Sequence, residues 1–185
     1  MSPAEFLSWE RTQPTRHEYC GGEVFAIAGG SPRHNALVAN ITAVLVTGLR
    51  GGPCRVLSSD QRIAVRDAEA YVYADATVFC GGLHLQPGTS DVLDNPSAVV
   101  EVLSPSTEAH DRGLKWEGYR RITSVRDYLL VSQHVPRIEH YRRESDGSWH
   151  YEVAEAGERL KLSNGVVLSV DEVFSGVMDL AAEER

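Results

Sequence analysis

Two short apolar runs, each interrupted by a single acidic residue, constrain the fold of this chain more than any other feature. Residues 98–103 read AVVEVL, with Glu101 inside the run. Residues 71–79 read YVYADATVF, with Asp75 inside the run. Short runs rich in β-branched and aromatic residues are typical of buried β-strands. Burying an ionised carboxylate alone is very costly, so each acid is expected to have a counter-charge, a proton or a metal ion.

The two acidic strands are expected to be neighbours in one sheet, because only the loop at residues 81–95 separates them. Alternation along the strands would then place both carboxylates on one face. Two close carboxylates repel each other, and Mg²⁺ or Mn²⁺ relieves that repulsion, held by one or two carboxylates with water and a substrate phosphate. The pattern therefore predicts a metal site at Asp75 and Glu101. In the alternative interpretation both acids are structural and pair with arginines such as Arg62 or Arg112.

A basic helix is predicted directly after the second acidic strand. Residues 111–121 read DRGLKWEGYRR, and helical spacing places Arg112, Lys115 and Tyr119 on one face. A lysine close to the acids could orient an attacking water or contact a phosphate, whereas a helix lysine elsewhere is a solvated surface residue. Two acids and a lysine in this order suit the cleavage of a phosphodiester bond.

The remaining pattern predicts one α/β or α+β domain, residues 1–185, with a mixed sheet. Helices are predicted at residues 3–11, where Ser2 and Glu5 form a capping box, and at residues 32–49. A turn is predicted at residues 66–69. Strands are predicted at residues 17–19, 23–28, 55–65, 127–131, 137–143, 149–154, 160–162 and 166–170, with a short helix at 171–174.

Composition limits which partners and which cellular compartment are expected for this chain. No apolar stretch approaches the roughly 20 residues of a membrane helix, and the N-terminus lacks the apolar core of a signal peptide. Cys20, Cys54 and Cys80 form no CxxC pair, which favours free thiols in a reducing cytoplasm. The net charge of −8 argues against nucleic-acid binding, unless acidic residues are gathered at a metal site.

Taken together, these motifs resemble the Uma family of restriction endonucleases, within the PD-(D/E)XK nuclease superfamily. The resemblance covers most of residues 1–175. Its motifs are the Asp75 strand, Glu-x-φ-Ser-Pro-Ser-Thr from Glu101, Asp-Arg-x-x-Lys-x-x-x-Tyr from Asp111, the Val-x-Asp-Tyr-Leu-Leu-Val strand, His17-Glu18-Tyr19 and Ser31-Pro32-Arg33-His34. The resemblance implies a restriction-endonuclease-like central mixed sheet flanked by helices, Mg²⁺-dependent DNA cleavage and a homodimer.

Carried over by position, the resemblance assigns a role to each candidate. Asp75 corresponds to the acid of the first motif and Glu101 to the acid of the second. The superfamily pattern has a lysine two residues after the second acid, where this chain has Leu103. In the Uma family the lysine comes from the following helix, which points to Lys115. Glu18 matches a recurrent acid of the first strand and is a candidate third metal ligand.

Three functions remain open from the sequence. The first is a cytoplasmic endonuclease that uses Mg²⁺, or Mn²⁺ as a substitute, to cleave DNA. The second is a catalytically idle binding module on the same fold, favoured by the net charge and by Leu103. The third is a metal phosphoesterase acting on RNA or small nucleotides. His34 is expected to pack or hydrogen-bond near the cleft. Arg137, Arg142 and Arg143 either contact a DNA backbone or form an exposed polar face.

Overall fold

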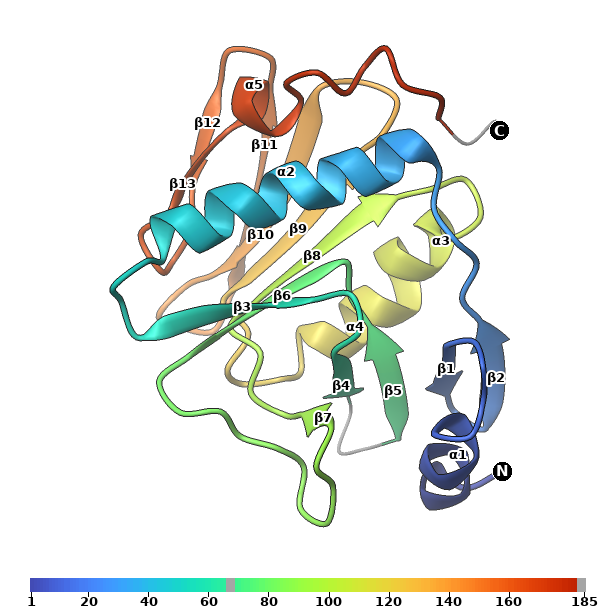
Figure 1. Ribbon diagram of the computed structural model, residues 1–185. Helices are drawn as coiled ribbons and strands as arrows, with labels where there is room; N and C mark the ends of the chain where they lie inside the picture. The colour runs from blue at the N-terminus through green and yellow to red at the C-terminus, as the bar shows by residue number, and fades with distance from the viewer. Residues whose placement is uncertain (66–68, 183–185) are drawn as a thin grey trace.

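The computed structural model of this protein describes residues 1–65 and 69–182, and it shows two larger β-sheets with helices around them (Figure 1). The larger sheet has six strands in the spatial order β11 (Trp149–Glu155), β10 (Arg137–Arg143), β9 (Asp127–Ser132), β8 (Ala98–Leu103), β6 (Ala76–Cys80) and β3 (Cys54–Ser58). In this sheet β8 and β9 are parallel, and the other neighbours are antiparallel. The predicted mixed sheet is therefore confirmed.

The second sheet has five short strands and lies beside the first. Their order is β2 (Glu23–Ala26), β1 (His17–Cys20), β5 (Ala70–Tyr73), β4 (Arg62–Val65) and β7 (Val92–Leu93). A separate hairpin is formed by β12 (Arg159–Lys161) and β13 (Val167–Ser169). The loop predicted at residues 81–95 thus contains one short strand. Of the turn predicted at residues 66–69, residues 66–68 lie outside the described residues.

Two segments that were predicted as single strands cross from one sheet to the other. Residues 55–65 divide into β3, in the larger sheet, and β4, in the smaller one. Residues 71–79 divide in the same way into β5 and β6, with Ala74 and Asp75 at the crossing. The crossing places Asp75 at the junction of the two sheets.

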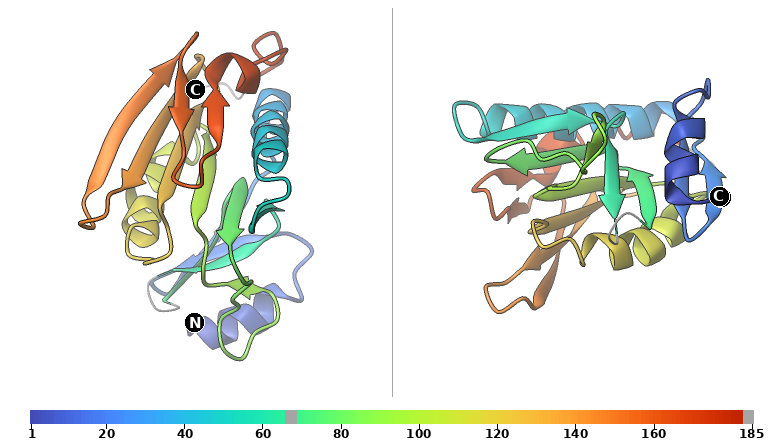
Figure 2. Two further views of the ribbon diagram at one scale, coloured as in Figure 1. Left: turned by 90° about the vertical axis from the view of Figure 1, so that its left-hand side faces the viewer. Right: turned by 90° about the horizontal axis from the view of Figure 1, so that it is seen from below.

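Helices cover both faces of the six-stranded sheet (Figure 2). On one face α2 (Pro32–Gly48) and α5 (Val170–Val173) pack over a core that includes Leu37, Ile41 and Leu45. On the other face lies a continuous helical segment, made of α3 (Glu108–His110), the π-helical η1 (Asp111–Lys115) and α4 (Trp116–Tyr119). No helix in the described ranges is both long and apolar enough to cross a membrane.

The N-terminal helix α1 (Pro3–Glu10) has the predicted capping box. The Ser2 side chain accepts a hydrogen bond from the Glu5 backbone N–H, and the Glu5 carboxylate accepts one from the Ser2 N–H. Such reciprocal bonds satisfy backbone donors that have no partner within the helix. Phe6 from this helix stacks on Tyr19 and Tyr71 and so anchors α1 on the five-stranded sheet.

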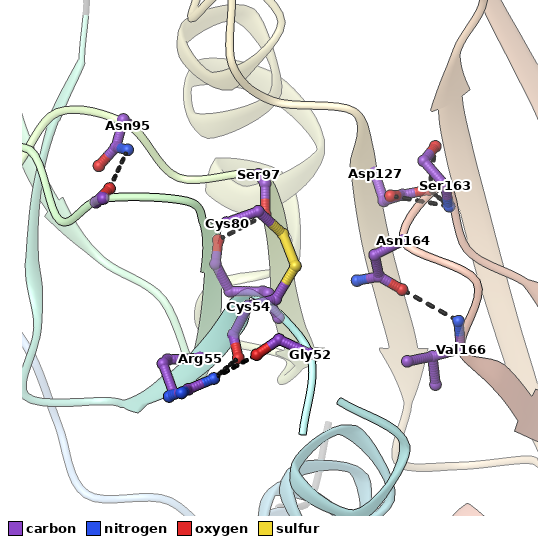
Figure 3. The surroundings of a disulfide bond; sticks show 12 residues. Gly52, Cys54, Arg55, Cys80, Asn95, Ser97, Asp127, Ser163, Asn164 and Val166 are labelled. Atoms are coloured by element: carbon purple, nitrogen blue, oxygen red, sulfur yellow. Dashed lines mark hydrogen bonds between the residues drawn. A yellow bond between two sulfur atoms is a disulfide. The ribbon is translucent and has the colours of Figure 1, made fainter. Parts of the chain in front are cut away.

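Cys54 and Cys80 are joined by a disulfide, so the prediction of free thiols is wrong for these two residues (Figure 3). They are directly opposed in the antiparallel pair of β3 and β6, although 26 positions separate them in the sequence. The free-thiol prediction rested on the spacing of cysteines along the chain, whereas this pairing depends on the register of β3 and β6. The disulfide also removes one argument for a reducing compartment, and a cytoplasmic location stays a prediction.

Candidate active site

The candidate site lies where the two sheets meet. The backbone N–H of Asp75 donates to the carbonyl of Val100 at 3.0 Å, and its Oδ2 accepts a hydrogen bond from the Val102 N–H at 2.7 Å. These bonds tie Asp75 to the strand that carries Glu101. The two acidic strands are therefore adjacent, as predicted, and their pairing is antiparallel. Glu18 reaches the same junction from β1 of the smaller sheet.

Lys115 lies at the centre of this junction. Its Nζ is 3.0 Å from Glu18 Oε1, 3.2 Å from Glu101 Oε1 and 3.2 Å from Asp111 Oδ1. The same ammonium donates a hydrogen bond to the carbonyl oxygen of Tyr73 at 3.0 Å. All four charged side chains are buried. The structure therefore brings Glu18, Glu101 and Lys115 together, with Asp75 beside them, and adds Asp111.

The π-helical turn determines which side chains of the helix face the sheet. Hydrogen bonds from residue i to i+5 widen the helix at η1, a form that is frequent at functional sites. Asp111, Lys115 and Tyr119 are all buried, at a spacing of four residues. Arg112, predicted on the same face as Lys115, instead makes a two-point contact with Glu139 at 2.7 and 2.8 Å. The prediction that Arg112 shares one helical face with Lys115 and Tyr119 is therefore wrong.

The arginines proposed as structural partners of the site acids lie elsewhere. Arg112 is held by Glu139 and by Glu108. Arg62 pairs with Asp91 at 2.8 Å and donates to the hydroxyl of Tyr73. The alternative interpretation is therefore wrong for both arginines, and the counter-charge of the buried acids is Lys115.

Polar groups around the acids fix their orientation. The Tyr119 hydroxyl donates to Glu101 Oε1 at 3.0 Å, and the Tyr73 backbone N–H donates to Glu18 Oε1 at 3.0 Å. His34, near the start of α2, places Nε2 3.4 Å from Asp75 Oδ2, close to the site as expected. His110 Nε2 is 3.2 Å from Glu18 Oε2.

Burial and mutual repulsion set the protonation of these groups. Burial raises the pKa of Glu101 well above its usual value; Lys115 opposes this, and the charges of Asp111, Asp75 and Glu18 add to it. Burial also raises the pKa of Asp111. Burial lowers the pKa of Lys115, but the surrounding carboxylates outweigh it and hold this pKa well above the ordinary value. Lys115 is thus an ammonium, and the raised pKa values of Glu101 and Asp111 show that the site disfavours full ionisation of the acids around it.

The donor set fits a small divalent cation. Glu18, Glu101 and Asp111 surround Lys115, Asp75 lies on the neighbouring strand segment, and carboxylate oxygens are the ligands that suit Mg²⁺ and Mn²⁺. Within residues 1–65 and 69–182, no three His, Cys, Asp or Glu side chains already surround one ion position. Since Lys115 lies among three of these carboxylates, an ion at Asp75 and Glu101 would need water or substrate for its other ligands.

Sequence reasoning assigned no role to Asp111 or His110. Asp111 precedes an arginine in a polar segment, which is the usual pattern of a solvated helix face. The available signal was the spacing of Asp111, Lys115 and Tyr119, which places one acid, one base and one hydroxyl on a common helical stripe. His110 carries no such signal, because its contact with Glu18 joins segments that are 92 positions apart.

The fold and the site together define an α+β protein in which acidic residues and a lysine lie at the junction of two sheets. A solved structure titled "putative nuclease belonging to DUF820", from Anabaena variabilis, matches with a TM-score of 0.72 at 18% identity. The match covers 95% of this chain and 98% of that one. At this identity the likeness concerns the fold, and the expected restriction-endonuclease-like fold is confirmed.

The chain belongs to the Uma2 family, described as "Putative restriction endonuclease", which matches residues 3–182. The resemblance seen in the sequence is thereby confirmed. Two uncharacterized proteins of Synechocystis sp. are also similar. One, slr1290, is 35% identical over 178 residues, 96% of this chain and 93% of that protein. The other, sll1609, is 32% identical over 149 residues, 80% of this chain and 84% of that protein.

Proposed function

We propose that this protein is a metal-dependent endonuclease that hydrolyses phosphodiester bonds of DNA. The observation that carries the proposal is the position of the Lys115 ammonium, within 3.2 Å of Glu18, Glu101 and Asp111 and next to the strand crossing at Asp75. A buried cation in an acidic site at a sheet junction suits the handling of water and phosphate. The family description, "Putative restriction endonuclease", supports the same reaction class.

Each side chain of the site would have a separate role in this reaction. Asp75 and Glu101 would hold Mg²⁺ or Mn²⁺, with Glu18 as a further candidate ligand. When bound, the metal would lower the pKa of a water molecule that it holds and stabilise the negative charge that develops on the phosphate. Lys115 would position the attacking water or contact the phosphate oxygens. Glu18 and Asp111 fix the Lys115 ammonium, and the Tyr119 hydroxyl orients Glu101.

A metal titration with a charge-removing variant tests the site. We expect Mn²⁺ to bind the wild-type protein in titration calorimetry and to bind Glu101→Gln much more weakly, because glutamine keeps the shape and removes the charge. Glu23→Gln is the matched control, since Glu23 is an exposed acid on strand β2 of the smaller sheet. Equal binding by wild type and Glu101→Gln would exclude Glu101 as a ligand.

Cleavage tests the function itself. With Mg²⁺ or Mn²⁺ we expect nicking of plasmid DNA by wild type, and at least about a 100-fold loss in Asp75→Asn and Lys115→Met, the size of effect typical for a lost charge-stabilising group. Intact DNA after long incubation, without metal binding, would favour the idle binding module. Hydrolysis of RNA or nucleotides but not of DNA would identify the phosphoesterase. Sedimentation would test the homodimer, which stays a prediction.

A further inference from the structure

A group of arginines gathers around the segment between α4 and β9, in a chain whose net charge is −8. The arginine patch consists of Arg120, Arg121, Arg126 and Arg143. Three of these come from the segment that joins α4 to β9, and Arg143 ends β10. This segment and the β10–β11 hairpin lie side by side (Figure 2). A hydrogen bond from the Arg143 backbone N–H to the Arg126 carbonyl oxygen, at 2.7 Å, joins them.

Arg143 is held rigidly in the patch. Its guanidinium lies over the ring of Trp149, 4.6 Å from the ring centre, and donates to the carbonyl oxygens of Arg120 and Ile122. A guanidinium fixed in this way loses little conformational freedom when it binds a further group. Burial and the nearby charge of Arg126 lower the pKa of Arg143, which shows that like charges are crowded here.

Carboxylates neutralise the patch only in part. Glu117 is 3.8 Å from Arg120 and 3.6 Å from Arg121, and such exposed contacts contribute little. Arg120, Arg121 and Arg126 are exposed. Of the other hairpin arginines, Arg142 is paired with Glu144 and lies outside the patch. The patch thus presents a surplus of guanidinium groups to solvent.

We propose that the arginine patch binds the phosphate backbone of DNA without reading its sequence. Guanidinium groups match phosphate geometry, and phosphate contacts position a protein on DNA. Along the strands the patch is near the site: Arg126 precedes Asp127, which pairs with Ala98, three residues before Glu101. At the rise of a β-strand, this three-residue offset between Ala98 and Glu101 is about 10 Å, which is less than the length of a few nucleotides of DNA. The proposal adds a second DNA contact to the proposed function, but it does not depend on cleavage.

Binding without divalent metal tests the patch separately from the nuclease site. The probe is a fluorescein-labelled DNA duplex of random sequence, followed by anisotropy in EDTA at several salt concentrations. Arg121→Gln/Arg126→Gln is the test variant, because both side chains are exposed and folding should be unaffected. The control variant is Arg50→Gln/Arg159→Gln. It removes the same number of charges as the test variant, from two exposed arginines outside the patch.

We expect the test variant to bind the DNA duplex roughly tenfold more weakly than wild type. The slope of log K against log salt should become less steep by about 0.9 for each lost phosphate contact. The control should match wild type. Equal effects in both double variants, or no DNA binding by wild type, would overturn the proposal. Preference for an acidic peptide over DNA would overturn it in favour of a protein partner. Because this assay is run in EDTA and needs no cleavage, a failed nuclease site leaves its result unchanged, whereas a failed patch does not.

Discussion

Among single residues, Lys115 is the cation on which the buried acids depend. Lys115→Met keeps an unbranched side chain but leaves Glu18, Glu101 and Asp111 facing one another. Removing one partner of a buried ion pair costs about 3–5 kcal/mol. We expect urea denaturation to show a loss of that size in the free energy of unfolding. Lys161→Met, at an exposed position, should cost little.

A double variant separates this charge effect from lost packing. Glu101→Gln/Lys115→Met removes one charge of each sign, so it should be more stable than Lys115→Met alone. If Lys115→Met unfolds at the same urea concentration as wild type, the site does not need Lys115 as its counter-charge.

The residues of the site differ in how far the sequence could predict them. Asp75 and Glu101 could be found because each interrupts an apolar strand, where a carboxylate needs an explanation. Lys115 was suggested by its position on the helix after the second acidic strand and assigned through the family resemblance, whereas Glu18 could be found only through that resemblance. Asp111 was missed because an acid next to an arginine in a polar segment is typical of a solvated helix face, although its spacing to Lys115 and Tyr119 was an available signal.

At the scale of elements, the strand boundaries show the same limit. The segments at 55–65 and 71–79 were each predicted as one strand because both are rich in β-forming residues, although in the first segment the crossing falls on the polar residues 59–61. Periodicity reports burial and does not report which sheet a strand joins. The crossing becomes visible only through pairing, with β5 bonded to β1 and β4, and β6 bonded to β3 and β8.

The helical segment that carries Lys115 contains two glycines with opposite roles. A Cβ added at Gly118 would clash with the Val65 side chain of β4, whereas one added at Gly113 would meet no atom. Alanine is a better helix former than glycine by about 1 kcal/mol. We expect Gly113→Ala to raise the free energy of unfolding by up to about that amount. Gly118→Ala should lower it by about 1–3 kcal/mol through overpacking.

Thermal or urea unfolding of the two variants checks the sign of each change. Val65→Ala/Gly118→Ala provides the control, because the smaller side chain makes room for the new methyl group and should restore part of the loss. A Gly118→Ala variant as stable as Gly113→Ala would show that α4 can move away from β4 at little cost.

For the whole molecule, the distribution of charge matters more than its sum. The net charge of −8 argued against DNA binding when it was treated as uniform. In the structure Glu18, Glu101 and Asp111 are buried around Lys115, while arginines gather at another part of the surface. An acidic total is therefore compatible with a local DNA-binding surface.

The disulfide between Cys54 and Cys80 acts on the whole molecule through the unfolded chain. It closes a loop of 26 residues, and a loop of this length is expected to stabilise the folded state by about 3–4 kcal/mol. Reducing agent should therefore lower the urea midpoint of the wild-type protein. Cys54→Ala/Cys80→Ala should unfold near that lower midpoint with or without reducing agent, since only the cross-link differs. A wild-type midpoint that does not respond to reducing agent would mean that the two thiols are not joined in solution. The free-thiol prediction, and its argument for a reducing compartment, would then be restored.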